Sequence, residues 1–340
     1  MSDHPDISTI SRITIHNPVS CHYECIESVI HYLPKILGTR YGTEIHPNIA
    51  SISLVLNIVH EPGFIKYITT YRDQMINKYG FADIIINQVN DVGYNSNPDI
   101  TQIVQPPATG EIRIFLTLPG CEVAKFEVFN WPNTYYILHN YREAILTPGN
   151  VFYLAPHCKA KLPNNYFIPD VLPFTAKSVS YPDRPRQVPI NEGAWILIQG
   201  RANRRVFEQI KILIKFAMRQ PINGKPPINL VILSKSNNFI SQHPPNIHLI
   251  INSDFWDFHQ WAAKCNIIAT LVSQQTHHTY YTRKLTSSIS YGIAYQMHFL
   301  IDTALYNIYS DTLSSCFTYD NRHNFIKTLK RVLSSLPIED

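Results

Sequence analysis

The chain has 340 residues, of which 45% are apolar and only 16% are charged, so the composition excludes a disordered protein and predicts two compact domains. The formal net charge of +4 is too small to indicate general binding to nucleic acids or membranes. The chain has no apolar run of transmembrane length, no signal-peptide pattern at its start and no CxxC pair among its six cysteines. We therefore expect a soluble, cytoplasmic protein with free thiols and no transmembrane segment.

Short β-branched segments alternate with longer segments of helical period, and this pattern predicts an α/β fold with parallel sheets covered by helices. The strands expected in the first half span residues 12–16, 51–57, 82–88, 112–117, 134–138 and 151–154. The clearest helix lies between the first two strands and spans residues 21–37, because its apolar residues recur at spacings of three and four. Ser20 is the expected N-cap of this helix, and Gly38 is expected to end it.

A proline-rich segment separates two halves of similar pattern. Seven prolines lie between residues 156 and 189, and such a segment cannot sustain a helix. We predict an N-terminal domain over residues 1–172, a linker over 173–192 and a C-terminal domain over 193–340. The second domain is expected to contain strands 194–199, 228–233, 247–251, 267–272 and 298–301 and helices 203–218, 255–265, 286–297 and 321–334. The last of these helices is expected to pack back on the first domain.

Two Rossmann-like domains that face each other across a cleft are the architecture that this order predicts. Ligands of open parallel sheets bind at the carboxyl ends of the strands, so the cleft is the expected active site. No two of the twelve glycines are separated by a single residue, which excludes the GxGxxG dinucleotide motif, and the GxxxxGK and GxSxG motifs are also absent. The chain contains neither HExxH nor Asp-x-Asp, so we expect no obligatory metal ion.

Three arginines follow the first strand of the second domain. In the stretch QGRANRR (199–205), Gly200 permits a tight turn, and the three arginines stand where a helix begins. Helix N-termini and guanidinium groups both favour phosphate. A solvated helix start is the alternative, although basic residues there oppose the helix dipole. The expected phosphate contacts of this stretch are Arg201, Arg204 and Arg205.

A second group of phosphate-binding candidates precedes the helix expected over residues 286–297. Lys284 supplies a positive charge, and three consecutive hydroxyl residues offer O–H and N–H donors to phosphate oxygens. Ordinary capping of the helix by one hydroxyl is the alternative. The donor-binding candidates of this stretch are Tyr281, Lys284, Thr286, Ser287 and Ser288.

The second half resembles the C-terminal domain of GT-B-fold glycosyltransferases. The segments that carry the resemblance are ILIQGR (196–201), FWDFHQWAAKC (255–265), KLTSSISYGIAY (284–295) and HFLID (298–302). The resemblance implies that the basic residues and hydroxyls named above hold the diphosphate of a nucleotide sugar. The Glu-x7-Glu motif of many retaining members has no counterpart, which leaves the anomeric outcome open. The bias toward Asn, Ile and Tyr also resembles that of proteins from large DNA viruses.

A catalytic base is expected at the carboxyl edge of the first sheet. His22 lies in the first turn of the expected helix 21–37, and Glu24 or Glu27 could orient its imidazole for removal of a proton from a sugar hydroxyl. Glu24 is the second candidate base. A surface histidine is an equally good interpretation of His22. His139 follows the strand 134–138, where a buried, hydrogen-bonded histidine is the alternative.

The resemblance and these residues together predict a metal-independent glycosyltransferase that moves a sugar from a nucleotide-diphosphate sugar to a hydroxyl of a glycan or glycoprotein. Basic residues and helix N–H groups are expected to stabilise the leaving diphosphate. A nucleotide-sugar epimerase or hydrolase of the same fold is one alternative, and a noncatalytic sugar- or nucleotide-binding module is another. Nucleic acid is not an expected partner, because no basic stripe stands out along the chain.

Overall fold

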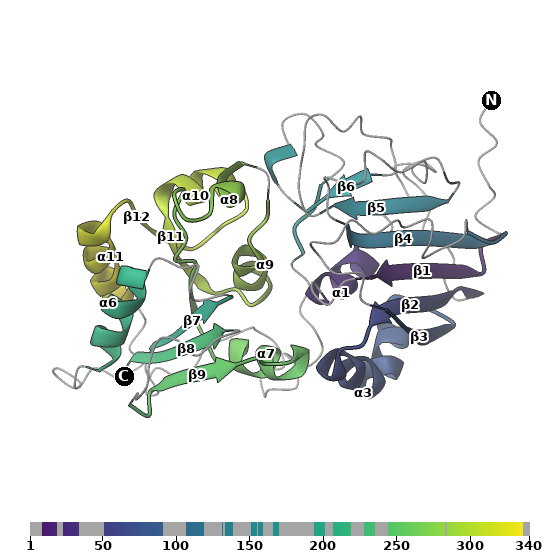
Figure 1. Ribbon diagram of the computed structural model, residues 1–340, viewed down its shortest axis with the longest axis horizontal. Coiled ribbons are helices and arrows are strands. Elements are labelled where there is room, and N and C mark those ends of the chain that lie inside the picture. The colour runs from purple at the N-terminus through teal and green to yellow at the C-terminus, as the bar shows by residue number, and fades with distance from the viewer. Residues whose placement is uncertain are drawn as a thin grey trace. The chain divides into compact units, whose positions relative to one another are not determined.

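Two six-stranded sheets form the framework of the chain, and the strand pairs among the described residues are all parallel (Figure 1). The computed structural model describes residues 9–18, 23–33, 51–90, 107–118, 131, 133–138, 151–154, 156–158, 166–169, 194–200, 207–218, 228–234, 244–282 and 284–335. The chain divides into one unit of Met1–Val171 with Arg283–Leu285 and a second of Leu172–Thr282 with Thr286–Asp340. The predicted α/β class with two Rossmann-like domains is confirmed.

The first sheet has the strand order β3-β2-β1-β4-β5-β6. Its strands are β1 (Arg12–Asn17), β2 (Ser53–Val59), β3 (Asp83–Val89), β4 (Glu111–Leu118), β5 (Thr134–Leu138) and β6 (Val151–Tyr153). Buried isoleucines and leucines occupy every second position of the central strands. Ile13 of β1, for example, pairs with Leu54 of β2 and Ile112 of β4. The predicted strand positions of this half agree with the structure to within about two residues at each end.

The α-helices of the first unit within the described residues are α1 (Glu24–His31) and α3 (Pro62–Tyr79). α1 begins three residues later than predicted, with Tyr23 at the N-cap position, and Ser20 and residues 34–38 lie outside the described part. α3 follows the usual punctuation of a helix, because Glu61 caps its start, Pro62 opens its first turn and Gly80 ends it at a φ of 76°.

A buried carboxylate ties these two helices together. Glu27 of α1 accepts hydrogen bonds from the hydroxyls of Tyr67 and Tyr79 and from Lys78 Nζ at 3.0 Å. A buried carboxylate needs such partners to remain charged. Glu27 therefore serves as a structural link between α1 and α3, and the role suggested for it beside His22 stays a prediction because His22 lies outside the described residues.

The second sheet has the order β12-β11-β10-β7-β8-β9, which is the same doubly wound topology. Its strands are β7 (Ala194–Gln199), β8 (Ile228–Ser234), β9 (Ile247–Ile251), β10 (Ile267–Ala269), β11 (His298–Asp302) and β12 (Cys316–Tyr319). The bounds of β7 and β9 are those predicted. β10 ends three residues earlier than predicted, and β12 at the edge of the sheet was not predicted.

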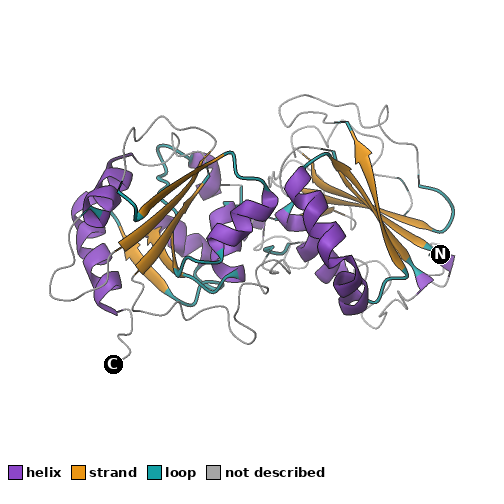
Figure 2. Cartoon of the chain, turned by 90° about the horizontal axis from the view of Figure 1, so that it is seen from below, coloured by secondary structure: helices purple, strands orange, loops and turns teal. Residues whose placement is uncertain are grey.

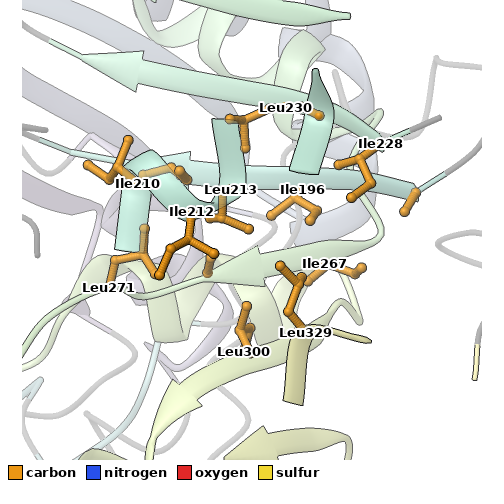
Figure 3. Packing of buried hydrophobic residues seen from close by; sticks show 14 of the residues in the cluster. Ile196, Ile210, Ile212, Leu213, Ile228, Leu230, Ile267, Leu271, Leu300 and Leu329 are labelled. Atoms are coloured by element: carbon orange, nitrogen blue, oxygen red, sulfur yellow. The ribbon is translucent and has the colours of Figure 1, made fainter. Parts of the chain in front are cut away.

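The second unit contains the helices α6 (Phe207–Ala217), α7 (Phe255–Ala262), α8 (His278–Thr282), α9 (Ser287–Ala294), α10 (Thr303–Tyr309) and α11 (Arg322–Ser335). α6 and α11 lie side by side on one face of the sheet (Figures 1 and 2). Their apolar sides meet the sheet in one buried cluster, in which Leu213 and Leu329 pack with Ile196 (Figure 3). α11, which we expected to return to the first domain, thus buries its apolar side in the core of its own unit.

Candidate functional site

The candidate site of the second unit lies between β7 and β10, where the order in which strands are added to the sheet reverses. β7 and β10 are neighbours, the chain continues from β7 to β8 on one side, and it continues from β10 to β11 on the other. Helical connections diverge from such a point, and ligands of doubly wound sheets bind there, beyond the carboxyl ends of the strands. The groups at this point belong to the end of β7, the segment after β10 and the first turn of α9.

Two backbone conformations mark the ends of these strands. Gly200 directly follows β7 with a φ of 100°, which favours glycine, and its N–H donates to the carbonyl of Leu233 at 3.1 Å. Leu271, two residues after β10, is fully buried and has a φ of 45°. A positive φ is uncommon for a large side chain, and such residues cluster at functional sites. This conformation also explains why β10 ends early.

The side chain of Gln199 connects the end of β7 to the start of α9. Its Nε2 donates to Ser287 Oγ at 2.9 Å, and Ser288 Oγ donates to its Oε1 at 3.0 Å. Thr286 occupies the N-cap position, but its side chain makes no capping hydrogen bond. Capping by one hydroxyl, the alternative weighed for this stretch, is therefore not what the structure has. The positive end of the α9 dipole remains without a side-chain cap at the carboxyl ends of β7 and β10.

A glycine allows α9 to lie close to the sheet. A Cβ atom on Gly292 would stand 2.2 Å from Phe299 Cζ and 2.9 Å from Ile268 Cγ2. Ile268 and Phe299 alternate along their strands with residues of the cluster under α6 and α11, so α9 covers the opposite face of the sheet. The close contact at Gly292 places the C-terminal half of α9 against β10 and β11.

Tyr281 and Asp302 join the segment after β10 to the end of β11. The Tyr281 hydroxyl donates to the carbonyl of Val272 at 3.0 Å and to Asp302 Oδ1 at 3.2 Å. Asp302 also caps α10, accepting from the N–H groups of Ala304 and Leu305. Burial raises the pKa of Asp302, and these hydrogen bonds only partly oppose the effect. Burial and the Asp302 carboxyl likewise raise the pKa of Tyr281. These contacts hold the Tyr281 side chain between the segment after β10 and the end of β11.

The structure brings part of the predicted donor-binding group together. Gly200 and Thr286 join Ser287 and Ser288 around the ends of β7 and β10, and Lys284 is half-buried two residues before Thr286. The candidates that lie outside the described residues are Arg201, Arg204, Arg205, His22 and His139. Glu24 is the first residue of α1, and its side chain also lies outside the described part.

The first unit has a row of hydrogen-bonded polar side chains at the corresponding point of its own sheet. His16, near the end of β1, lies within 3.4 Å of Asn57 Nδ2, and Asn87 Nδ2 donates to Asn57 Oδ1 at 3.0 Å. The imidazole stacks on Phe115 with 5.1 Å between ring centroids. Burial, followed by the charge of Arg113, lowers the pKa of His16 to about 4. His16 is therefore neutral at neutral pH.

Gln199, Asp302 and Leu271 are the residues of this site whose roles sequence reasoning missed. The position of Gln199 at the end of a predicted strand was the one available signal, because a polar side chain there faces the ligand side of the sheet. Among the described residues, no three His, Cys, Asp or Glu side chains form a group that would hold a metal ion. The search for a membrane-spanning helix within the same residues also finds none.

No protein-family model and no curated protein match the chain. Among solved structures, UDP-GlcNAc 2-epimerase from Neisseria meningitidis bound to UDP-GlcNAc is similar over 95% of this chain and 91% of its own, with 12% identity and a TM-score of 0.44. The α,α-trehalose 6-phosphate synthase from Burkholderia multivorans is similar over 96% and 91%, with 8% identity and a TM-score of 0.45. The glycotransferase of kitacinnamycin is similar over 96% and 90%, with 10% identity and a TM-score of 0.42.

Proposed function

We propose that this protein is a glycosyltransferase that binds a nucleotide-diphosphate sugar at the carboxyl ends of β7 and β10. The observation that carries the proposal is the connection of Gln199 to Ser287 and Ser288, which fixes the first turn of α9 at the switch point of the sheet. Backbone N–H groups at a helix start and fixed hydroxyls suit the oxygens of a diphosphate.

The positive charge for the diphosphate would come from side chains next to this turn. Arg201, Arg204 and Arg205 follow Gly200 in the chain, and Lys284 precedes Thr286. These cations and the helix dipole can neutralise a leaving diphosphate, which is the task of a divalent ion in other transferases. We therefore propose that donor binding needs no metal ion.

The acceptor would be a hydroxyl of a glycan or glycoprotein, activated by a base from the first unit. His22 is the first candidate for this base, and Glu24 and His139 are the others. Replacement of the base should lower turnover about 10²-fold or more and leave donor affinity intact.

An epimerase or hydrolase would act on the donor without an acceptor, so analysis of the products separates these functions. A noncatalytic module would bind the donor without turnover. The viral origin stays a prediction.

Calorimetric titration with UDP, GDP, ADP and their sugar conjugates, each with and without EDTA, tests the donor site. We expect one nucleoside diphosphate to bind equally well in both conditions. Arg201→Ala and Lys284→Ala should each weaken that binding by about 1.5–3 kcal/mol, the range for a hydrogen bond to a charged group. Lys264→Ala is the matched control, because Lys264 is exposed beyond the end of α7. Absence of binding by every nucleoside diphosphate would overturn the proposal.

A further inference from the structure

The exposed side of α11 carries positive charges and no negative ones. Of the positions from Arg322 to Arg331, those that are exposed are all basic, and the helix contains no acidic residue. Protein surfaces normally intersperse charges of both signs, and a field of one sign is typical of a surface that attracts an opposite charge. The exposed basic residues of α11 are Arg322, His323, Lys327, Lys330 and Arg331.

α6 extends the same surface. Its exposed positions recur every three or four residues and carry Glu208, Lys211 and Lys215, and Met218 directly after the helix continues the series. Met218 is 62% exposed, the highest value among the exposed large apolar residues of the described part. α6 and α11 lie side by side (Figure 2), so their exposed sides form one surface, which we call the α6/α11 basic face.

Glu208 shows that the cations of both helices are close together. Its carboxylate lies 3.1 Å from Lys211 Nζ on α6 and 3.9 Å from a guanidinium nitrogen of Arg322 on α11. Lys211, and more weakly Arg322 and Lys215, lower the pKa of this exposed carboxyl. One carboxylate thus stands among cations that it cannot all neutralise.

The charge of this face exceeds that of the whole chain. α6 and α11 together contain six Lys and Arg residues against one Glu, a net charge of +5, whereas the full chain carries +4. The remaining residues are therefore weakly negative as a group. The two helices are far apart in the sequence, so the fold concentrates a charge that looks dispersed along the chain.

We propose that the α6/α11 basic face adsorbs to the surface of a membrane rich in anionic phospholipids. Each Lys or Arg near such a surface contributes about 1 kcal/mol to binding, so several together give a measurable affinity. Met218 stands on the same stripe as Lys211 and Lys215, where an apolar side chain can enter the lipid interface. The apolar sides of both helices stay in the core, so the contact is electrostatic and peripheral. It does not depend on the proposed donor site.

Nucleic acid is the rival polyanion, and the described surface favours it less. Proteins that bind single strands stack bases on exposed aromatic rings. The exposed large apolar residues of the described part are Ile85, Met218 and Ile251, and none of them is aromatic. Phe317, whose ring centroid lies 5.5 Å from the guanidinium carbon of Arg331, is half-buried. A flat lipid surface therefore fits this face better.

Co-sedimentation with vesicles of phosphatidylcholine and phosphatidylserine tests the proposal, with pure phosphatidylcholine vesicles as the neutral reference. We expect binding to the mixed vesicles only, and loss of binding at high salt. The double variant Lys327→Gln/Lys330→Gln should bind about 30-fold more weakly, because it removes two basic residues from the face. Both positions are exposed, so circular dichroism should show an unchanged fold.

The matched control is Lys66→Gln/Lys264→Gln, which removes the same charge from exposed positions outside the basic face. We expect this control to weaken vesicle binding less than about 3-fold. Equal losses in the two double variants would mean that net charge alone matters and would overturn the proposal. So would the absence of binding to the mixed vesicles, or tighter binding to a DNA duplex than to the vesicles at the same ionic strength.

Discussion

The two sheets have the same strand order but bury different side chains at their centres. In the first sheet, Thr14 and His16 of β1 share a face with Glu111 and Arg113 of β4. In the second, the corresponding central strands β7 and β10 meet through apolar residues such as Leu197 and Ile268. A doubly wound order needs only parallel pairing and right-handed connections. The chemistry of the centre is therefore free to differ, and the function must be argued from the side chains rather than from the fold.

The polar centre of the first sheet holds a buried ion pair. Arg113 and Glu111 lie 2.9 Å apart, with 10% and 7% of their side chains exposed. Burial alone would raise the pKa of Glu111, but hydrogen bonds from Thr14 and Ala108, together with Arg113, lower it below its ordinary value. Such a pair is sensitive to the loss of one partner, because the other charge is then left buried and unpaired.

The largest effect we predict comes from breaking this pair. Arg113→Met should lower the free energy of unfolding by about 3–5 kcal/mol, measured by urea denaturation. The matched control is Arg72→Met, which removes an ion pair with Asp83 whose side chains are 47% and 39% exposed. That control should cost less than about 1 kcal/mol. Similar losses in the two variants would show that the polar centre of the first sheet is not special.

The second prediction concerns pH and separates the two units by their histidines. The folded state keeps His16 neutral down to a pKa of about 4, whereas the unfolded chain protonates it near 6.5. The unfolded state thus binds more protons in this range, and stability falls as the pH drops from about 6.5 to 4. The loss is on the order of 3 kcal/mol. His16→Gln should remove it, as measured by unfolding at several pH values.

His298 of the second unit is the internal comparison for that experiment. Burial also lowers the pKa of His298, but this side chain is only half-buried. We call the fall of stability between about pH 6.5 and pH 4 the acid limb of the stability profile. His298→Gln should therefore reduce this fall less than His16→Gln does. An acid limb that persists in full in the His16→Gln variant would contradict the assignment of this limb to His16.

Most of the framework could be predicted from the sequence, because buried parallel strands are nearly continuous apolar runs. This is why the bounds of β7, in which four of six residues are buried, were predicted to the residue. β12 was not predicted because its four residues, CFTY, mix polar and aromatic side chains at a sheet edge and are mostly half-buried. The early end of β10 depends on the backbone of Leu271, whose conformation no local sequence signal announces.

The candidate site could be predicted only as far as it follows from chain order. A strand, a turn and a helix start define where Gly200 and the hydroxyls of residues 286–288 must lie, so that region was found. The partner of these hydroxyls was not found, because Gln199 is 88 residues away from Ser287 and 89 from Ser288. The row of polar side chains formed by His16, Asn57 and Asn87 likewise depends on the register of three strands. That register could not be predicted from the sequence.

The third prediction tests how closely α9 must approach its sheet. Gly292→Ala places a Cβ 2.2 Å from the buried ring of Phe299, and overpacking of this kind costs about 1–3 kcal/mol. The double variant Gly292→Ala/Phe299→Leu makes room and should recover part of the stability. Both values come from urea denaturation. If the single variant were as stable as the parent chain, the close approach of α9 would not be a constraint.

The last and smallest predicted effect compares two amide side chains, Gln199 at the second switch point and Asn57 at the first. Gln199→Leu leaves the buried Ser288 hydroxyl without its partner and should cost about 1 kcal/mol of stability. Asn57→Leu interrupts the row of polar side chains from His16 to Asn87 at a similar cost. Only Gln199→Leu should also weaken nucleoside-diphosphate binding, because only Gln199 positions the first turn of α9.

A triple variant separates the two effects of Gln199. Gln199→Leu combined with Ser287→Ala and Ser288→Ala removes both hydrogen bonds together with every side-chain donor and acceptor that makes them, and such joint removal is nearly neutral for stability. Urea denaturation should therefore show recovery relative to Gln199→Leu alone. Calorimetry should show no recovery of nucleoside-diphosphate binding, because the partly exposed Ser287 hydroxyl and the link from Gln199 to the first turn of α9 are both gone. Recovery of both would mean that this cluster only holds the fold together, and the donor site would then have to be sought at another part of the second unit.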